Sequence, residues 1–228
     1  MSGILYGVGV GPGDPELMTL KAVRLIEETD VIAVPGTVPE KSTAYKIALG
    51  AVPALASKQL LPIYTPMKND RAAIKAEHKK NAQKVEKYLS AGKNVVYITL
   101  GDPTVYSTYS YLQKIIAADG FDTRYISGVT SFCAAAAQLG TPLSEWDEPL
   151  HIIPALHKKD KGFIEDGNYV LMKSGKEIPA VKKMLKKEGL SVCAVENCGM
   201  DSQKIYRDLD EIPDDAGYFL LVIAKRQP

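Results

Sequence analysis

The sequence predicts an α/β protein with two domains, each a mixed or mainly parallel sheet flanked by helices. Residues 4–8 and 30–36 are apolar runs separated by a glycine-rich loop and a helical pattern, an order that favours parallel pairing. Residues 95–100 are apolar and β-branched and stop at Gly101, which makes them the clearest strand of the chain. After residue 118 the predicted strands outnumber the helices, so a mixed sheet is expected there.

Three helices are predicted in the first half of the chain. The first begins at Thr19, and the others cover residues 71–89 and 105–118. The mixture of predicted elements changes at Ala118-Asp119-Gly120, after which strands outnumber helices. We therefore expect an N-terminal α/β domain over residues 1–119 and a C-terminal α/β domain over residues 120–228.

The second half is predicted to hold short strands and two helices. The helices are expected at residues 131–139 and 178–187. The strands are expected at residues 123–127, 150–154, 169–173, 191–196, 204–207 and 218–224.

Composition points to an ordinary soluble cytoplasmic protein. The 228 residues are 46% hydrophobic and 24% charged, and the formal net charge of +1 gives no strong field for nucleic acid or an anionic membrane. The longest apolar run, residues 219–224, is too short to span a bilayer, and no basic, then apolar leader opens the chain. The odd set Cys133, Cys193 and Cys198 forms no CxxC pair, so buried thiols in a reducing compartment are expected.

The glycine-rich loop does not match the common nucleotide-binding motifs. A G-x-G-x-x-G that starts at Gly7 or Gly9 would need glycine where Pro12 and Asp14 stand. Gly92-Lys93-Asn94 lacks the serine or threonine of a P-loop. Two interpretations stay open: a tight strand-to-helix turn, or a place where a ligand approaches bare backbone.

Other common site chemistries are not indicated. The three histidines, 78, 151 and 157, lack the H-E-x-x-H spacing and do not combine with the cysteines, so no metal site is expected. No G-x-S-x-G supports a hydrolase. The lysine-rich residues 157–161 and 182–187 are interpreted as solvated faces, with contact to carboxylates as the alternative.

Two further strand-to-helix junctions are candidates for ligand contact. Gly101-Asp102-Pro103 follows the clearest strand, and ligands collect at the carboxyl ends of strands in open α/β sheets. Asp102 either caps the next helix or holds a polar ligand group. Gly128-Val129-Thr130-Ser131-Phe132 is similar, and Thr130 or Ser131 either caps a helix or reaches a ligand.

These junctions carry a family resemblance. Leu5–Ala22, Leu100–Ser107, Gly128–Phe132 and Val170–Lys173 resemble, in order and at normal spacing, four motifs of the tetrapyrrole methylase family. Ser127 takes the place of the proline that usually precedes the third motif. The resemblance covers essentially the whole chain.

The segment Glu196–Met200, followed by Lys204–Tyr206, resembles the subgroup that methylates C-20 of precorrin-2 or of cobalt-factor II in cobalamin biosynthesis. The alternatives are a sibling methylase acting at C-11, at C-17, or at C-2 and C-7 of uroporphyrinogen, and a non-catalytic tetrapyrrole-binding protein. A related methylase of ribosomal RNA or diphthamide is a further alternative. The near-neutral charge disfavours RNA, and the C-terminal motif argues more strongly against this alternative.

The resemblance implies two α/β domains with the active site in the cleft between them, S-adenosylmethionine as methyl donor, a tetrapyrrole substrate and a homodimer. It assigns no catalytic base, and no protein-bound metal is expected. The implied cofactor contacts are Pro12, Gly101, Asp102, Val105, Tyr106, Thr130, Ser131, Phe132, Met172, Asn197 and Cys198.

Overall fold

A computed structural model describes residues 2–66, 70–154, 166–173 and 177–226. The chain forms two compact units, residues 1–130 and 131–228, and each is described by itself. The lysine-rich residues 157–161 lie outside the described ranges.

The N-terminal unit is a five-stranded, fully parallel sheet in the order β3-β2-β4-β1-β5. Its strands are β1 (Leu5–Gly9), β2 (Val31–Pro35), β3 (Gln59–Ile63), β4 (Val95–Thr99) and β5 (Thr123–Ile126). Its helices are α1 (Leu20–Glu28), α2 (Thr43–Ala51), α3 (Arg71–Ser90) and α4 (Tyr109–Ala118).

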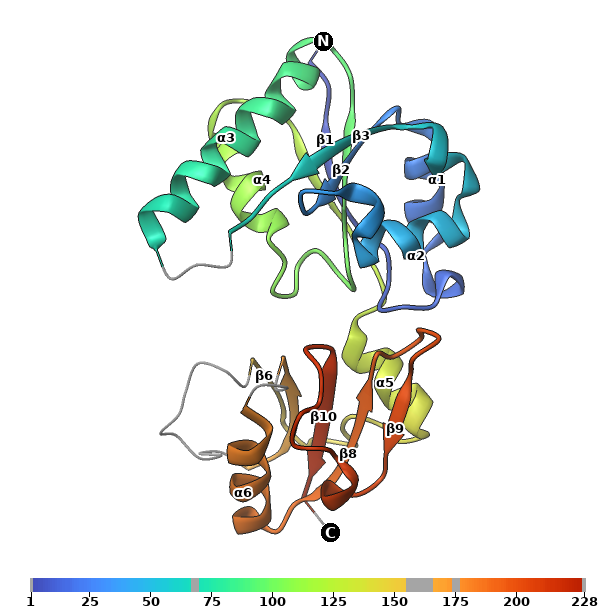
Figure 1. Ribbon diagram of the computed structural model, residues 1–228, viewed down its shortest axis with the longest axis vertical. Coiled ribbons are helices and arrows are strands. Elements are labelled where there is room, and N and C mark those ends of the chain that lie inside the picture. Colours follow the sequence, from blue (N-terminus) through green and yellow to red (C-terminus); the bar gives the residue numbers. More distant parts are fainter. Residues whose placement is uncertain (1, 67–69, 155–165, 174–176, 227–228) are drawn as a thin grey trace. The chain divides into compact units, whose positions relative to one another are not determined.

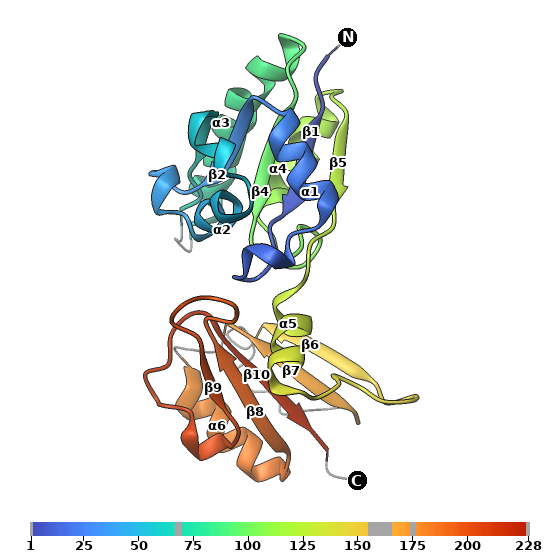
Figure 2. The same cartoon turned by 90° about the vertical axis from the view of Figure 1, so that its right-hand side faces the viewer.

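Helices cover both faces of this sheet (Figures 1 and 2). Alternating strand residues point to opposite faces. Val8 and Ile98 pack in one apolar core with Ile26 of α1 and residues of α2. Leu5 and Tyr97 pack in the other with residues of α3 and α4. The unit is therefore a doubly wound sheet, and the strands are buried on both sides.

The structure differs from the prediction at two boundaries and contains two elements that were not predicted. Strand β5 pairs with β1, so the first unit extends beyond the predicted limit at residue 119 and ends at Thr130. Helix α4 begins at Tyr109 instead of residue 105, because Tyr106 has a left-handed backbone (φ 48°) and the Ser107 hydroxyl accepts from Tyr109 N–H (3.2 Å). Helix α2 and strand β3 were not predicted.

The C-terminal unit is a mixed sheet, as expected, in the order β6-β7-β10-β8-β9. Strands β6 and β7 are parallel, and the other neighbours are antiparallel. The strands are β6 (Leu150–Pro154), β7 (Asn168–Met172), β8 (Ser191–Glu196), β9 (Lys204–Tyr206) and β10 (Leu220–Lys225). The helices are α5 (Ser131–Leu139) and α6 (Ile178–Glu188).

Each helix of this unit covers one face of the sheet. Ile178 and Leu185 of α6 pack with Leu171 and Val222 in the apolar core of one face. Helix α5 contacts β8 and β10 and contributes no residue to that core, so it lies against the opposite face (Figure 2). The cysteines differ in exposure: Cys198 is buried as expected, whereas Cys193 is partly buried and Cys133 is exposed.

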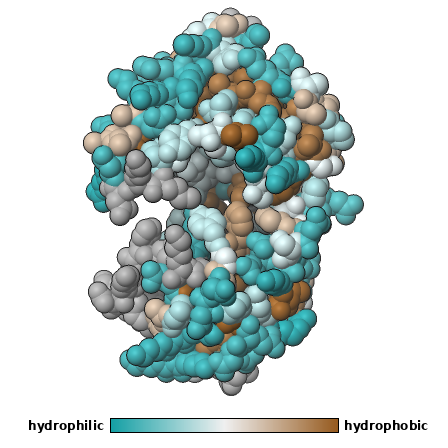
Figure 3. All heavy atoms as spheres, in the orientation of Figure 1, coloured by the Kyte–Doolittle hydropathy of each residue, from teal (hydrophilic) through white to brown (hydrophobic). Residues whose placement is uncertain are grey.

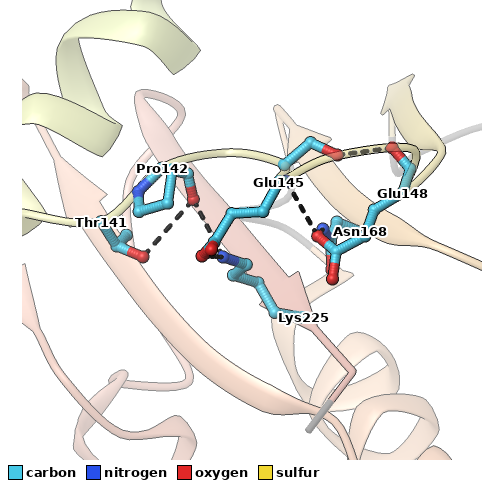
Figure 4. A network of polar contacts seen from close by, with 7 residues as sticks. Thr141, Pro142, Glu145, Glu148, Asn168 and Lys225 are labelled. Atoms are coloured by element: carbon cyan, nitrogen blue, oxygen red, sulfur yellow. Dashed lines mark hydrogen bonds and ion pairs between the residues drawn. The ribbon is translucent and has the colours of Figure 1, made fainter. Parts of the chain in front are cut away.

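The segment between α5 and β6 is held by a polar network (Figure 4). Lys225 Nζ donates to Pro142 O (3.1 Å) and lies 3.7 Å from Glu145 Oε1. Glu148 Oε2 accepts from Asn168 Nδ2 (2.7 Å) and from Glu145 N–H (3.0 Å). These bonds tie the segment to β7 and β10 at the amino end of β6.

One face of the molecule is mainly polar. Hydrophilic side chains cover most of the face seen in Figure 3, and hydrophobic residues are exposed there in small separate patches. Lys182 and Lys186 of the second lysine-rich stretch form ion pairs with Asp214 (3.1 Å) and Asp210 (2.5 Å). Within the described ranges, no helix is both long and apolar enough to cross a membrane.

Candidate functional site

The parallel sheet has a switch point between β1 and β4. These strands are neighbours, yet the chain leaves β1 for α1 on one face and leaves β4 for α4 on the other. Ligands of open α/β sheets bind in the crevice outside the carboxyl ends of such strands. Pro12 follows β1 and Gly101 follows β4, so two of the predicted contacts lie at this position.

Main-chain hydrogen bonds join the two loops. Val10 N–H donates to Thr99 O (2.9 Å), and Gly101 N–H donates to Gly11 O (2.8 Å). Gly101 has φ +64°, a left-handed conformation that glycine adopts without steric cost. An isolated bridge between Gly11 and Gly101 thus joins the two loops beyond the ends of both strands.

At two positions of this edge, close contacts between main-chain atoms leave room only for glycine. A Cβ on Gly9 would lie 2.4 Å from Gly101 O and 2.8 Å from Gly128 Cα, and a Cβ on Gly128 would lie 2.3 Å from Gly101 O. The loops after β1, β4 and β5 therefore touch through main-chain atoms. For Gly9 and Gly128 the tight-turn interpretation accounts for the glycine without a ligand.

Asp102 ties two of these loops together. Its Oδ1 accepts from Thr104 N–H (2.7 Å) and the Thr104 hydroxyl (2.5 Å), and its Oδ2 accepts from Gly128 N–H (3.0 Å). Burial raises the pKa of this carboxyl, but the hydrogen bonds from Thr104, Gly128 and Ser127 outweigh it, and the pKa lies below its usual value. Asp102 does not cap α4, which starts seven residues later at Tyr109; it caps the turn at Thr104.

The segment between Asp102 and α4 carries two more predicted contacts, Val105 and Tyr106. Val105 is partly buried, and Tyr106 is half exposed in a left-handed conformation that is uncommon outside glycine. The segment is anchored to β4 by a hydrogen bond between the Thr99 and Ser107 hydroxyls (3.1 Å). Backbone strain of this kind is concentrated at functional sites.

Thr130 carries a hydroxyl that is shielded from solvent. Its Oγ1 has no hydrogen-bond partner in the described part of the chain, so Thr130 does not cap α5. A buried hydroxyl without a partner is destabilising, and a polar ligand atom would satisfy it. The next two predicted contacts, Ser131 and the buried Phe132, are the first residues of α5 in the second unit.

The remaining predicted contacts gather at one edge of the mixed sheet. Met172 ends β7 and Glu196 ends β8, and both strands run antiparallel to β10. Their carboxyl ends therefore lie at the same edge, on either side of the start of β10, where Leu221 pairs with Met172. Asn197 and Cys198 follow directly after β8.

The loop after β8 is tightly bonded. Asn197 has φ +53° and its N–H donates to Phe219 O (3.4 Å), while Gly199 N–H donates to Gln203 Oε1 (2.7 Å). Cys198 is buried, and burial raises the pKa of its thiol. The neutral thiol is thereby favoured, which does not suit a nucleophilic role.

Glu196 was not among the predicted site residues, yet it organises this edge. It is 7% exposed; its Oε1 accepts from Gly217 N–H (2.6 Å) and its Oε2 accepts from the Tyr206 hydroxyl (3.0 Å). Burial and then the bond to Glu196 raise the pKa of Tyr206 to about 12. A carboxylate that ends the apolar strand Ser191–Glu196 is the sequence signal that could have identified it.

Most of the predicted contacts thus form two groups, one after the strands of the parallel sheet and one at the carboxyl ends of β7 and β8. Ser131 and Phe132 belong to neither group, because they begin helix α5. Within the described residues, no three His, Cys, Asp or Glu side chains converge into a metal-binding group.

Comparison with known proteins identifies the family of the chain. A family model for the tetrapyrrole (corrin/porphyrin) methylases matches residues 4–213. The chain belongs to the tetrapyrrole methylase family. It is 34% identical to a probable cobalt-precorrin-2 C(20)-methyltransferase of Methanocaldococcus jannaschii, over 97% of this chain and 96% of that protein. It is 29% identical to a precorrin-2 C(20)-methyltransferase of Sinorhizobium, over 98% and 97% of the two chains.

The fold is also that of solved tetrapyrrole methylases. The uroporphyrin-III C-methyltransferase of Thermus thermophilus, solved in complex with S-adenosylhomocysteine, superposes with a TM-score of 0.69 over 98% of this chain and 97% of its own. Sequence identity between the two is 21%, so the likeness is one of fold.

Proposed function

We propose that this protein transfers a methyl group from S-adenosylmethionine to C-20 of precorrin-2 or of cobalt-factor II. The observation that carries the proposal is near-full-length similarity to two proteins named for C-20 methylation of this substrate type. The segment Glu196–Met200, followed by Lys204–Tyr206, supports the ring position because it resembles the subgroup that methylates C-20. We further propose that the protein works as a cytoplasmic homodimer.

The residues of the N-terminal edge fit a ligand held largely through backbone. Gly101 and Pro12 flank the switch point, and the buried Thr130 hydroxyl has no hydrogen-bond partner among the residues that the structure describes. We propose that these residues, with Val105 and Tyr106, contact the methyl donor. Asp102 supports them by fixing the loops, because its carboxylate already accepts hydrogen bonds from Thr104 and Gly128.

The remaining proposed contacts, Ser131, Phe132, Met172, Asn197 and Cys198, belong to the C-terminal unit. The bound donor supplies an electrophilic sulfonium methyl group, and the electron-rich ring carbon is the nucleophile. The protein then has to hold carbon, methyl and sulfur in line and keep water away, which needs positioning more than acid–base groups. The neutral thiol favoured at Cys198 is in keeping with such a role.

The test is a methyl-transfer assay. Carbon-13-labelled S-adenosylmethionine is incubated anaerobically with precorrin-2 and, separately, with cobalt-factor II, and NMR locates the new methyl group. We expect a single label on C-20 from at least one substrate. Label on C-11 or C-17 would overturn the ring position, and no label on either substrate would overturn the function.

A variant at the buried hydroxyl tests the donor site in the same assay. Thr130→Val keeps the shape of the side chain and removes the hydroxyl, so donor affinity should fall by roughly tenfold if Oγ1 bonds the ligand. Gly101→Val is unsuitable, because valine at φ +64° would strain the fold itself. Calorimetry with S-adenosylhomocysteine measures the affinity, and unchanged affinity would remove Thr130 from the site.

A further inference from the structure

A turn at the edge of the mixed sheet displays two aromatic rings. Leu220 N–H donates to Gly217 O (3.2 Å) and closes the turn, which places Tyr218 and Phe219 at its tip. Their side chains are 49% and 38% exposed, and the rings pack edge to face with centroids 5.3 Å apart. Adjacent exposed aromatic residues on a fixed turn are a common sign of a binding surface.

The turn is fixed to the loop that carries Asn197. Gly217 N–H donates to the buried Glu196, and Phe219 O accepts from Asn197 N–H. A Cβ on Gly217 would lie 2.6 Å from Glu196 Oε1, so the close contact needs glycine. The aromatic pair therefore has a defined position beside the proposed donor contacts Met172 and Asn197.

A cation lies at the same edge. Lys173 directly follows Met172, whose partner in β10 is Leu221, so Lys173 lies across from the end of the turn. It is partly buried with φ +59°. Among the described residues its ammonium group has neither an ion-pair nor a hydrogen-bond partner, in contrast to Lys182 and Lys186 of α6.

We propose that Lys173, Tyr218 and Phe219 form a substrate subsite, here called the aromatic edge. The two rings contact the apolar face of the tetrapyrrole, and Lys173 pairs with one of its peripheral carboxylates. This inference rests on the proposed function. An edge that combines aromatic carbon with an unpaired cation matches a flat macrocycle rimmed by carboxylates.

Trp146, the most exposed aromatic residue among the described residues of this unit, provides a matched control. Trp146 is 102% exposed and precedes the amino end of β6. Because β6 is parallel to β7, Trp146 lies at the sheet edge opposite Met172 and Lys173. Lys183 of α6 is exposed and serves as the control for charge removal.

The experiment measures two affinities in the full-length protein. Equilibrium dialysis gives the dissociation constant of cobalt-factor II, and calorimetry gives that of S-adenosylhomocysteine. Tyr218→Ala/Phe219→Ala and Lys173→Gln are each expected to weaken cobalt-factor II binding by roughly tenfold or more and to leave S-adenosylhomocysteine binding unchanged. Trp146→Ala and Lys183→Gln should change neither affinity, and circular dichroism verifies that every variant is folded.

The outcomes separate this proposal from the function on which it rests. Wild-type affinity for cobalt-factor II in the folded aromatic-edge variants would overturn the subsite and leave the methyltransferase proposal standing. Weakened binding of S-adenosylhomocysteine in the double variant would mean that the rings hold the donor, which also overturns the subsite. A wild-type protein that neither binds cobalt-factor II nor methylates any tetrapyrrole would overturn both.

Discussion

Each sheet has an edge that carries predicted contacts, and different interactions hold the loops of each edge in place. In the parallel sheet, Gly9, Gly101 and Gly128 meet through main-chain atoms, and Asp102 joins two backbone segments. In the mixed sheet, the side chain of Glu196 connects a turn and a neighbouring strand. One edge is built from backbone, and the other depends on a side chain.

This difference determines which substitutions each edge tolerates. Backbone contacts leave no room for a Cβ, and an N–H donor cannot become an acceptor. Both Asp102 oxygens accept from backbone N–H groups. One Glu196 oxygen accepts from a hydroxyl, which can rotate and accept instead. The parallel edge should therefore be the less tolerant of the two.

The largest effect is expected at the glycine contact. Gly128→Ala puts a Cβ 2.3 Å from Gly101 O, and the loops must move apart. We expect it to lower the free energy of unfolding of the N-terminal unit by about 3 kcal/mol, the upper part of the range for overpacking against atoms that cannot yield. Urea unfolding followed by hydrogen exchange and mass spectrometry reports each unit separately.

The control for this substitution is Gly140→Ala. Gly140 has φ +67° with nothing within 4 Å of the added Cβ, so it measures the cost of a left-handed alanine alone, about 1 kcal/mol. Gly128 has no left-handed backbone, so a cost there comes from the contact itself, and an unchanged free energy of unfolding in Gly128→Ala would show that the glycine contact does not hold the parallel edge.

Replacing each carboxylate by its amide should affect stability differently at Asp102 and at Glu196. In Asp102→Asn the amide nitrogen cannot accept, so Gly128 N–H or Thr104 N–H loses its partner, at a cost of about 2 kcal/mol. In Glu196→Gln the oxygen can still accept from Gly217 N–H while the amide donates to the Tyr206 oxygen. We expect a change below about 0.5 kcal/mol there, measured in the same urea experiment.

The comparison would fail if Glu196→Gln proved as costly as Asp102→Asn. Glu196→Ala serves as the reference for losing both bonds of that side chain, and it should cost about 2 kcal/mol because Gly217 N–H is left without an acceptor. A harmless Glu196→Ala would show that the carboxylate does not organise the mixed edge.

Most of the regular structure followed from local sequence patterns. The apolar β-branched runs predicted β4 and β8, and Thr19 was identified as the start of α1, where its hydroxyl accepts from Ala22 N–H. Strand β3 was missed because Gln59–Ile63 contains Pro62 and lies at the edge of the sheet, where proline is tolerated. The strand β5 was predicted, but the domain limit at residue 119 placed it in the wrong unit. Its pairing with β1, far away in the sequence, produces no local sequence pattern.

The sequence predicted which loops carry the candidate site, but it did not predict the contacts between the residues of those loops. Glycine spacing marked the loops, yet it did not show that Gly9 and Gly128 contact each other instead of a ligand. The bond from Gly217 to Glu196 joins residues 21 positions apart, and no periodic pattern encodes such a contact. The exposed turn of Tyr218 and Phe219 was expected to be part of a strand, because both residues favour strands.

The smallest expected effect is a loss of stability of the parallel edge at acid pH. The pKa of Asp102 is lowered in the folded state, so its charged form stabilises the fold above its ordinary value of 3.8, and this contribution is lost as pH falls through the lower folded value. Asp102→Asn lacks the contribution at every pH. The difference in urea midpoint between wild type and variant should thus be largest near pH 6 and shrink below about pH 4. Because the other carboxylates titrate in both proteins, the difference isolates Asp102. A difference that stayed constant down to pH 2.5 would mean that the hydrogen bonds from Thr104 and Gly128 to Asp102 do not depend on the charge of its carboxyl group.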